Sequence, residues 1–253
     1  MSKVPLTSKV ALVTGAGRNI GREIALNLAA SGLAVAVNVR TSVEEGQAVV
    51  DEISANNGHA LLCVADVADQ SAVRQMVADI EKHWGRLDIL VNNAAVRREA
   101  KLEDISAGDW QRILAIVLDG AFFCSQAALP LLRKSKQATI INIGGMTGHT
   151  GASNRVHVVT AKAGLAGMTR ALAHELAREG ITVNCVAPGL IDTVRHAASS
   201  AASPNHRSRD HTLLARHGTT SDVAQSVAWL ASDGARFVTG QVIHVNGGAY
   251  LGG

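Results

Sequence analysis

Near its start, the chain has an apolar, β-branched run that stops at glycines and continues in an amphipathic pattern; residues 10–21 read VALVTGAGRNIG. A strand, a turn over residues 14–19 and a helix that opens near Ile20 leave several backbone N–H groups unpaired and pointing at one place. The glycines let the backbone approach a diphosphate, and the positive end of the helix stabilises its charge. A tight turn whose glycines only pack the helix is the alternative, and a βαβ context decides between the two.

Strand and helix patterns alternate along the rest of the chain. Short apolar runs typical of strands cover residues 34–39, 61–65, 88–95, 139–143, 181–186 and 242–245, and helical spacing is found at 22–31, 42–57, 69–84, 110–132, 156–178 and 219–232. Hydrophobic residues make up 47% of the 253 residues but aromatic ones only 3%, so the core must be built from Ala, Val, Leu and Ile, as in buried parallel strands between Ala-rich helices. We therefore expect a single α/β domain over residues 1–253.

Two of these helices are predicted to begin at capping motifs. Ser42 followed by Glu45 has the spacing of a capping box, and Ser106 with Asp109 has the same spacing before the long helix at 110–132. The basic residues at the end of that long helix complement its dipole, so we assign them no ligand.

The end of the second strand bears on the choice of cofactor. In a dinucleotide-binding fold this position meets the adenosine ribose and is acidic when the 2′-hydroxyl is free. Here it reads Asn38-Val39-Arg40-Thr41-Ser42, without a carboxylate. Arg40 and Arg18 can surround a 2′-phosphate, which favours NADP over NAD, although both are also compatible with solvated surface arginines. At the end of the third strand, Asp66 can accept from the adenine amino group, cap its own turn, or do both.

Composition excludes several other classes of function. The formal net charge is only +3 and the basic residues are dispersed, which argues against nucleic acid as a partner. Cys63, Cys124 and Cys185 lack a metal-ligand spacing and lie among apolar residues, so we predict buried thiols and no metal site. The first nine residues lack the apolar core of a signal peptide, and no apolar run approaches membrane-spanning length. These features predict a soluble, cytoplasmic protein without a membrane partner.

Residues 193–218 differ from the rest of the chain, because they are rich in Ser, Ala, His and Arg and contain a single carboxylate. A polar stretch near the ligand edge of the sheet is typical of a mobile substrate lid. Arg195, Arg207 and Arg209 can then face an anionic substrate. A solvated loop without a ligand is the alternative.

The motifs together resemble the classical short-chain dehydrogenase/reductase family over nearly the whole chain. The matching pieces are Thr14-Gly15 to Ile20-Gly21, Asp66-Val67, Asn92-Asn93-Ala94, Lys162, Asn184 to Pro188-Gly189, Thr239-Gly240-Gln241 and Asn246-Gly247-Gly248. The resemblance implies a Rossmann-type three-layer sandwich with a seven-stranded parallel sheet, a nicotinamide cofactor, a small-molecule substrate and a homotetramer or dimer built on the long helices. It implies that the cofactor is bound by Gly15, Arg18, Asn19, Ile20, Gly21, Arg40, Asp66, Val67, Asn93, Lys162, Pro188, Gly189, Ile191 and Thr193.

The sequence departs from the family pattern in its glycine turn and in its catalytic positions. Asn19 stands at the family's second glycine, and asparagine tolerates the left-handed backbone better than most residues. Of the family's catalytic tyrosine, serine, asparagine and lysine, the first three positions hold Val158, Gly145 and Val117, so only Lys162 remains. The single tyrosine of the chain is Tyr250, so no shifted alignment restores the usual acid.

These departures leave two hypotheses for function. The first is an NADP-dependent oxidoreductase with a rebuilt proton path, which uses a histidine, water or a substrate such as an iminium that needs no strong acid. His157 is five residues before Lys162 and points about 140° away around the helix. His149 and Thr147 on the glycine loop, and a histidine of the lid, are freer to reach the nicotinamide. Tyr250 can also enter the site of a partner subunit. The second hypothesis is a cofactor-binding protein without turnover that acts as a sensor or as a silent subunit.

Overall fold

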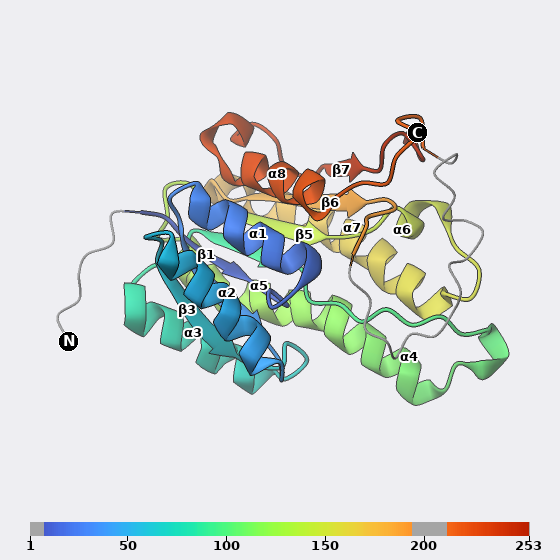
Figure 1. Cartoon of the computed structure of the whole chain (residues 1–253), viewed down its shortest axis with the longest axis horizontal. Helices are drawn as coiled ribbons and strands as arrows, with labels where there is room; N and C mark the ends of the chain where they lie inside the picture. Colours follow the sequence, from blue (N-terminus) through green and yellow to red (C-terminus); the bar gives the residue numbers. More distant parts are fainter. Residues whose placement is uncertain (1–7, 194–211, 253) are drawn as a thin grey trace.

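The computed structural model describes residues 8–193 and 212–252, which form one sheet with helices on both sides. All strand pairs are parallel, and the order across the sheet is β3-β2-β1-β4-β5-β6-β7. The expected Rossmann-type architecture with seven parallel strands is confirmed (Figure 1). The strands are β1 (Val10–Val13), β2 (Ala34–Val39), β3 (Ala60–Val64), β4 (Ile89–Asn92), β5 (Thr139–Ile143), β6 (Thr182–Pro188) and β7 (Val242–Val245).

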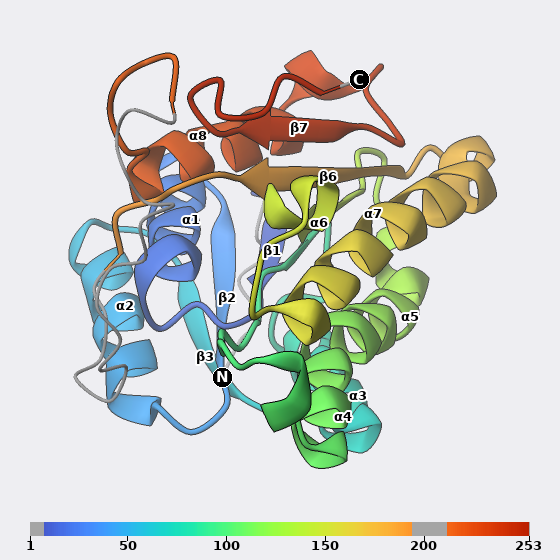
Figure 2. The same ribbon diagram turned by 90° about the vertical axis from the view of Figure 1, so that its right-hand side faces the viewer.

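The helices divide between the two faces of the sheet (Figure 2). One face carries α1 (Asn19–Ala30), α2 (Val43–Ala55) and α8 (Thr220–Ala231), and α1 packs directly against α8. The other face carries α3 (Gln70–Trp84), α4 (Ala107–Leu114), α5 (Gly120–Leu132) and α7 (Val156–Leu176). Shorter helical segments include η1 (Leu102–Asp104), α6 (Thr147–Thr150), η3 (Ala177–Glu179) and η6 (Asp233–Ala235).

Successive side chains of a strand point to opposite faces of the sheet and so belong to two different core layers. In β1, Val10 and Leu12 belong to the core under α3, α5 and α7, whereas Ala11 and Val13 belong to the core under α1, α2 and α8. All four side chains are fully buried. β1, which is covered on both faces, is therefore apolar at every position, as expected for a buried parallel strand.

The long helix predicted at 110–132 is interrupted. A π-helical segment, η2 (Ala115–Asp119), joins α4 to α5, and Val117 lies within it. Gly120 follows at once, and a Cβ there would lie 2.8 Å from the Val67 side chain, so the chain passes close to the end of β3. Wide turns of this kind occur often at functional sites.

The two capping predictions have different outcomes. Ser106 Oγ accepts from Asp109 N at 3.0 Å, which confirms the cap of α4. The capping box at Ser42 is wrong, because its side chain makes no cap hydrogen bond. The backbone closes a tighter turn there, with Val43 N donating to the Thr41 carbonyl at 2.9 Å.

One expectation about the membrane needs correction. Within the described residues, the helical stretch Ala107–Leu132 is long and apolar enough to cross a membrane by length and composition alone. The statement that no apolar run approaches that length is therefore wrong. Part of this stretch is buried inside the protein, where α5 packs against α3 and β4, and buried core helices pass the same test.

Candidate functional site

The site lies at the carboxyl ends of β1 and β4, where the strand order reverses direction and open α/β sheets bind ligands. Thr14 joins the two strands: its N–H donates to the Val91 carbonyl at 3.0 Å, and its Oγ1 accepts from the backbone N–H groups of Asn93 and Ala94 at 2.9 and 3.0 Å. Asn93 Nδ2 donates to the carbonyls of Thr14 and Gly15 at 2.8 and 3.0 Å. Asn93 therefore fixes the shape of the turn from within the chain.

The glycines of the turn are required by close backbone packing. Gly15 has φ +62°, and a Cβ there would lie 2.9 Å from Ala94 Cα. A Cβ on Gly21 would lie 2.3 Å from the Gly15 carbonyl oxygen. Because this oxygen belongs to the backbone, no movement of a side chain can relieve the clash. Asn19 has φ +50°, so the residue at the family's second glycine position does adopt the left-handed backbone.

The start of α1 fits an anionic group such as a diphosphate. Arg18 is the N-cap and makes no side-chain cap hydrogen bond, and the first turn of the helix contains no acidic residue. The N–H groups of Ile20 and Gly21 thus face a position at the positive end of the helix without a carboxylate cap. A cavity of about 440 Å³ opens there, lined by Arg18, Asn19, Arg22, Glu23, Glu45, Asp192, Thr193 and Thr220.

At the adenosine end, each predicted phosphate ligand already faces a carboxylate. Arg40 Nη1 lies 3.8 Å from Asp66 Oδ2, and Arg18 Nη1 lies 4.0 Å from Glu45 Oε1. Asp66 Oδ1 accepts from Ala68 N at 3.0 Å, so the predicted local turn is present. All these side chains are at least one-third exposed, which leaves the guanidinium groups accessible to a ligand.

Asn38 is the residue of this site that the sequence reasoning missed. It is 2% exposed, and its Oδ1 accepts from Gly15 N at 3.2 Å. Its Nδ2 lies 3.1–3.3 Å from the carbonyl oxygens of Val39, Cys63 and Ala65. The only signal in the sequence was a polar residue inside an otherwise apolar strand.

Lys162 of α7 reaches the carboxyl end of β5, where its Nζ donates to the Ile143 carbonyl at 2.5 Å. Burial lowers the pKa of this ammonium from 10.5 to about 8; Cys185 opposes the shift and the positive charge of Arg97 adds to it. A Cβ on Gly145 would lie 3.9 Å from Lys162 Cγ, so a Cβ fits there without a clash. The base of the site therefore holds the Lys162 ammonium close to Gly145, which has no side chain.

The two positions that the resemblance assigns to the catalytic asparagine and tyrosine, 117 and 158, belong to one apolar cluster. Val117 is 2% exposed and packs with Ile113, Ala121, Ala161 and Leu165. Val158, one helical turn before Lys162, packs against the same cluster. Val117 and Val158 are thus aliphatic side chains of one packed cluster.

His149 and His157, which were considered as replacement acids, both make contacts within their own chain. His149 of α6 packs against His244 of β7 with ring centroids 4.8 Å apart, and Tyr250 lies 6.0 and 5.0 Å from the two rings. Tyr250 therefore contacts rings of its own chain. His157 is fully buried, and its Nδ1 accepts from Val158 N at 3.0 Å, which caps the first turn of α7.

The histidine pair predicts a loss of stability in mild acid. Burial lowers the pKa of both rings, and the charge of Arg170 on His149 and of His149 on His244 adds to the shift. The unfolded chain therefore takes up protons first as pH falls below about 6.5, so folding stability should decrease there and not above it. Thermal unfolding at pH 7.5 and 5.5 measures this. We expect the double variant His149→Phe, His244→Phe to lose less melting temperature over that interval than the wild type; an equal loss contradicts the prediction.

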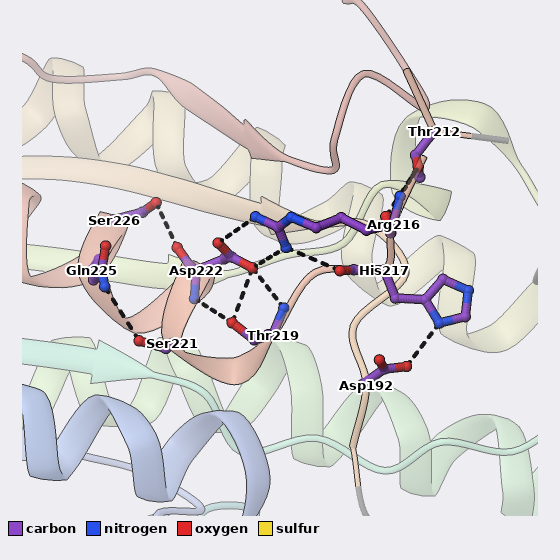
Figure 3. A network of polar contacts seen from close by, with 9 residues as sticks. All are labelled: Asp192, Thr212, Arg216, His217, Thr219, Ser221, Asp222, Gln225 and Ser226. Carbon is purple, nitrogen blue, oxygen red and sulfur yellow. Dashed lines mark hydrogen bonds and ion pairs between the residues drawn. The ribbon is translucent and has the colours of Figure 1, made fainter. Parts of the chain in front are cut away.

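Both ends of the predicted lid are tied to the fold, although residues 194–211, with Arg195, Arg207 and Arg209, lie outside the described residues. His217 Nδ1 lies 2.8 Å from Asp192 Oδ1 (Figure 3). Gly218 pairs with the backbone of residues 190–192. Arg216 forms a two-point ion pair with Asp222 and holds the pKa of that carboxyl well below its ordinary value. Thr219 and Asp222 complete a capping box at α8.

The predicted cofactor residues at the carboxyl end of β6 form another wall of the site. Gly189 N donates to the Val245 carbonyl at 2.9 Å, and a Cβ on Gly189 would lie 2.6 Å from Asn246 Cβ. The Pro188 carbonyl accepts from Met146 N at 2.9 Å, which brings this wall beside the loop that follows Gly145. Ile191 bridges to Gly218, and Thr193 lines the cavity at α1.

Comparison with known proteins identifies the family of the chain. A family model described as enoyl-(acyl carrier protein) reductase matches residues 15–250. The chain is 42% identical over 246 residues to the 3-oxoacyl-[acyl-carrier-protein] reductase FabG of Staphylococcus aureus, covering 96% of this chain and 99% of that protein. It is 40% identical over 251 residues to the (2S)-[(R)-hydroxy(phenyl)methyl]succinyl-CoA dehydrogenase subunit BbsD of Thauera aromatica, covering 97% and 98%.

Solved structures agree with the fold. A short-chain dehydrogenase from Burkholderia cenocepacia J2315 in complex with NADP matches with a TM-score of 0.89 and 36% identity, covering 96% of this chain and 98% of that one. A dehydrogenase/reductase from Sinorhizobium meliloti 1021 matches with a TM-score of 0.90 and 35% identity, covering 98% of each chain.

Proposed function

The chain belongs to the short-chain dehydrogenase/reductase family, and from this premise we propose that it is an NADP(H)-binding oxidoreductase with a non-standard proton-transfer site. The observation that carries the proposal is the contrast around Lys162. The lysine and the glycine turn are kept, whereas the neighbouring catalytic positions are Gly145, Val158 and Val117. The chain keeps the features that hold a nicotinamide dinucleotide. It lacks the tyrosine and serine hydroxyls that, in the family, protonate the alkoxide formed by hydride transfer and bind the substrate carbonyl.

The residues present fit such a cofactor. The uncapped start of α1 and the cavity beside it suit a diphosphate, and Arg18 and Arg40 suit a 2′-phosphate. The NADP complex of a structural relative supports the same choice. When bound, this cofactor supplies or accepts a hydride. Lys162 would hold the nicotinamide ribose, and its Nζ is the remaining proton-holding group at the base of the site.

The substrate is proposed to be a small molecule that is reduced without a strong acid, such as an iminium, or one protonated by Lys162 or by water. A lysine with a pKa of about 8 releases its proton near neutral pH, which suits it to general acid chemistry. Several relatives are named as 3-oxoacyl-[acyl-carrier-protein] reductases. The carbonyl of such a substrate would meet no hydroxyl from positions 145 and 158, so we expect negligible reduction of simple ketones and ketoesters.

A catalytically silent NADP-binding homologue is the second candidate. It is favoured by the packing of Val117 and Val158 in one aliphatic cluster, because such a cluster stabilises the fold and leaves no proton path there. Turnover of NADPH against a panel of ketones, imines and enoyl thioesters separates the two candidates. Tight binding without turnover of any class supports the silent role, and turnover of one class supports the first.

We also propose an oligomeric state and a location for the protein. The exposed apolar side chains Phe122 on α5 and Val156 on α7 suit a homotetramer or dimer built on the long helices. A cytoplasmic location without nucleic-acid or membrane partners agrees with the low net charge and the reduced, buried cysteines. Light scattering of the purified protein tests the assembly.

Cofactor affinity should depend on pH through Lys162. The charged ammonium holds the ribose hydroxyls, so the affinity for NADPH should be constant below about pH 8 and fall as the pH rises through that value. Above it, the loss should approach tenfold per pH unit, as for any single titrating group. Fluorescence titration from pH 6.5 to 9.5 measures this, and Lys162→Met should bind weakly with a flat profile. A flat profile in the wild type would show that the ammonium is not used.

A further inference from the structure

Asn38 occupies a position where a polar side chain is costly unless it is fully bonded. It lies in the interior strand β2, next to Cys63 of β3, and is 2% exposed. Buried amides are normally satisfied on both ends. Here the oxygen accepts from the glycine turn and the nitrogen donates toward carbonyls at the ends of β2 and β3.

These contacts join the two halves of the cofactor crevice. On one side is Gly15 N, at the start of the turn that leads to the diphosphate position. On the other side are the carbonyls of Val39 and Ala65, the residues immediately before Arg40 and Asp66. The Asn38 backbone adds a further contact, because its carbonyl accepts from Ala16 N at 2.8 Å. One residue therefore spans the turn and the adenosine corner.

Strand pairing holds the adenosine corner together and Asn93 holds the turn, whereas Asn38 links the two. Strands β2 and β3 are paired up to Val39 and Val64, and Ala65 N donates to the Val39 carbonyl at 2.9 Å. The N–H groups of Gly15 and Ala16 are both directed to Asn38. Without the side chain, Gly15 would keep a buried, unpaired donor and the turn could shift relative to the corner.

We propose that Asn38 is a positioning residue for the cofactor, which holds the diphosphate turn at a fixed separation from the Arg40–Asp66 corner. This inference rests on the proposed dinucleotide-binding function. A dinucleotide contacts both halves and needs the separation, whereas a fragment that contacts only the corner does not.

The test compares two ligands and two buried asparagines. Asn38→Leu keeps the size of the side chain and removes its hydrogen bonds. Asn142→Leu is the control, because Asn142 is also a fully buried strand asparagine, but it is bonded to Asn92 and Thr169 away from the turn. Calorimetry gives the affinity of each protein for NADPH and for adenosine 2′-monophosphate, a fragment without the 5′-phosphate that would reach the turn.

We expect Asn38→Leu to bind NADPH at least about tenfold more weakly, because binding must then restore the separation between the turn and the corner, and to bind the monophosphate nearly as well as the wild type. Asn142→Leu should lose a similar amount of thermal stability but keep its NADPH affinity. Unchanged NADPH affinity in Asn38→Leu, an equal loss in the control, or an equal loss for both ligands would overturn the proposal.

A second variant covers the case in which Asn38→Leu does not fold. In Asn38→Ser, the hydroxyl is too short to reach Gly15 N and the carbonyls of β3 together, so amide hydrogen exchange at residues 15–16 should be faster than in the wild type. Unchanged exchange overturns the inference. A wild-type chain that binds neither ligand contradicts the proposed function itself, whereas normal wild-type binding with unaffected variants contradicts only the role of Asn38.

Discussion

The double variant Val158→Tyr, Gly145→Ser is expected to reduce a 3-oxoacyl ester with NADPH about 10²–10⁴-fold faster than the wild-type chain, which should show almost no turnover. The tyrosine would supply the proton that the alkoxide needs, and its position is one helical turn from Lys162. The serine would add a hydrogen bond to the carbonyl oxygen, and loss of such a donor typically costs about 10²–10³-fold. The two effects act on one transition state, so their product is not expected.

Space decides whether the two side chains can be accepted. Position 145 is open, since the nearest atom to a built Cβ is Lys162 Cγ at 3.9 Å. Val158 is only partly buried and lies at the margin of the cluster that contains Val117 and Ala161, so a tyrosine ring can turn toward the site. Val117→Asn, placed within the π-helical segment, is the natural third change.

Controls separate a restored proton path from a general change in the pocket. Val158→Phe has the ring without the hydroxyl and should leave the rate at the wild-type level. Adding Lys162→Met to the double variant should abolish the gain, because the lysine is needed to hold the ribose and to lower the tyrosine pKa. Wild-type turnover at ordinary family rates would refute the idea that the acid is missing.

Features encoded in short stretches were predictable from the sequence. The seven strands, the Gly15 turn, the left-handed Asn19 and the cap at Ser106 each depend on residues within a few positions of one another. The hydrophobic pattern and the turn chemistry were enough for them. The order of the motifs then placed Lys162 next to Gly145 and on the same helix as Val158.

Features that depend on contacts between distant residues were missed. Asn38 meets Gly15 across 23 residues, and nothing in β2 alone identifies that partner. The contact of Tyr250 with His149 depends on β7 and α6 lying side by side, which the strand order determines. At Ser42 the capping spacing was present, but the backbone turn that formed gave its side chain no N–H group to bind.

NADPH should bind about 10–100-fold more tightly than NADH, which is the second large effect expected. Hydrogen bonds from a guanidinium to a phosphate each contribute about 1.5–3 kcal/mol, and about 1.4 kcal/mol corresponds to a tenfold change in affinity. Both candidate donors are at hand: Arg40 follows β2 directly, and Arg18 is the N-cap of α1. No carboxylate stands at the end of β2 to accept the free 2′-hydroxyl of NADH.

The carboxylates that now face these arginines set an upper limit on the preference. Asp66 lies 3.8 Å from Arg40 and Glu45 lies 4.0 Å from Arg18, so a 2′-phosphate must compete with both. Exposed pairs of this kind are worth little, about 0–1 kcal/mol, and a dianionic phosphate with several acceptor oxygens should displace them. Glu45→Gln should accordingly leave NADPH affinity equal or slightly improved.

Substitution of the arginines gives the decisive measurement. Arg40→Ser should weaken NADPH by about tenfold or more and change NADH by less than about threefold, since only NADPH carries the phosphate. Arg133→Ser is the matched control for the lost charge, because Arg133 pairs with Glu179 at the far end of α5 and should affect neither ligand. Calorimetry at two salt concentrations adds a further check, because a charge-based preference must shrink as salt rises. Equal affinities for the two cofactors in the wild type would mean that Arg18 and Arg40 are ordinary surface residues, and the choice of NADP would then have no physical basis in this chain.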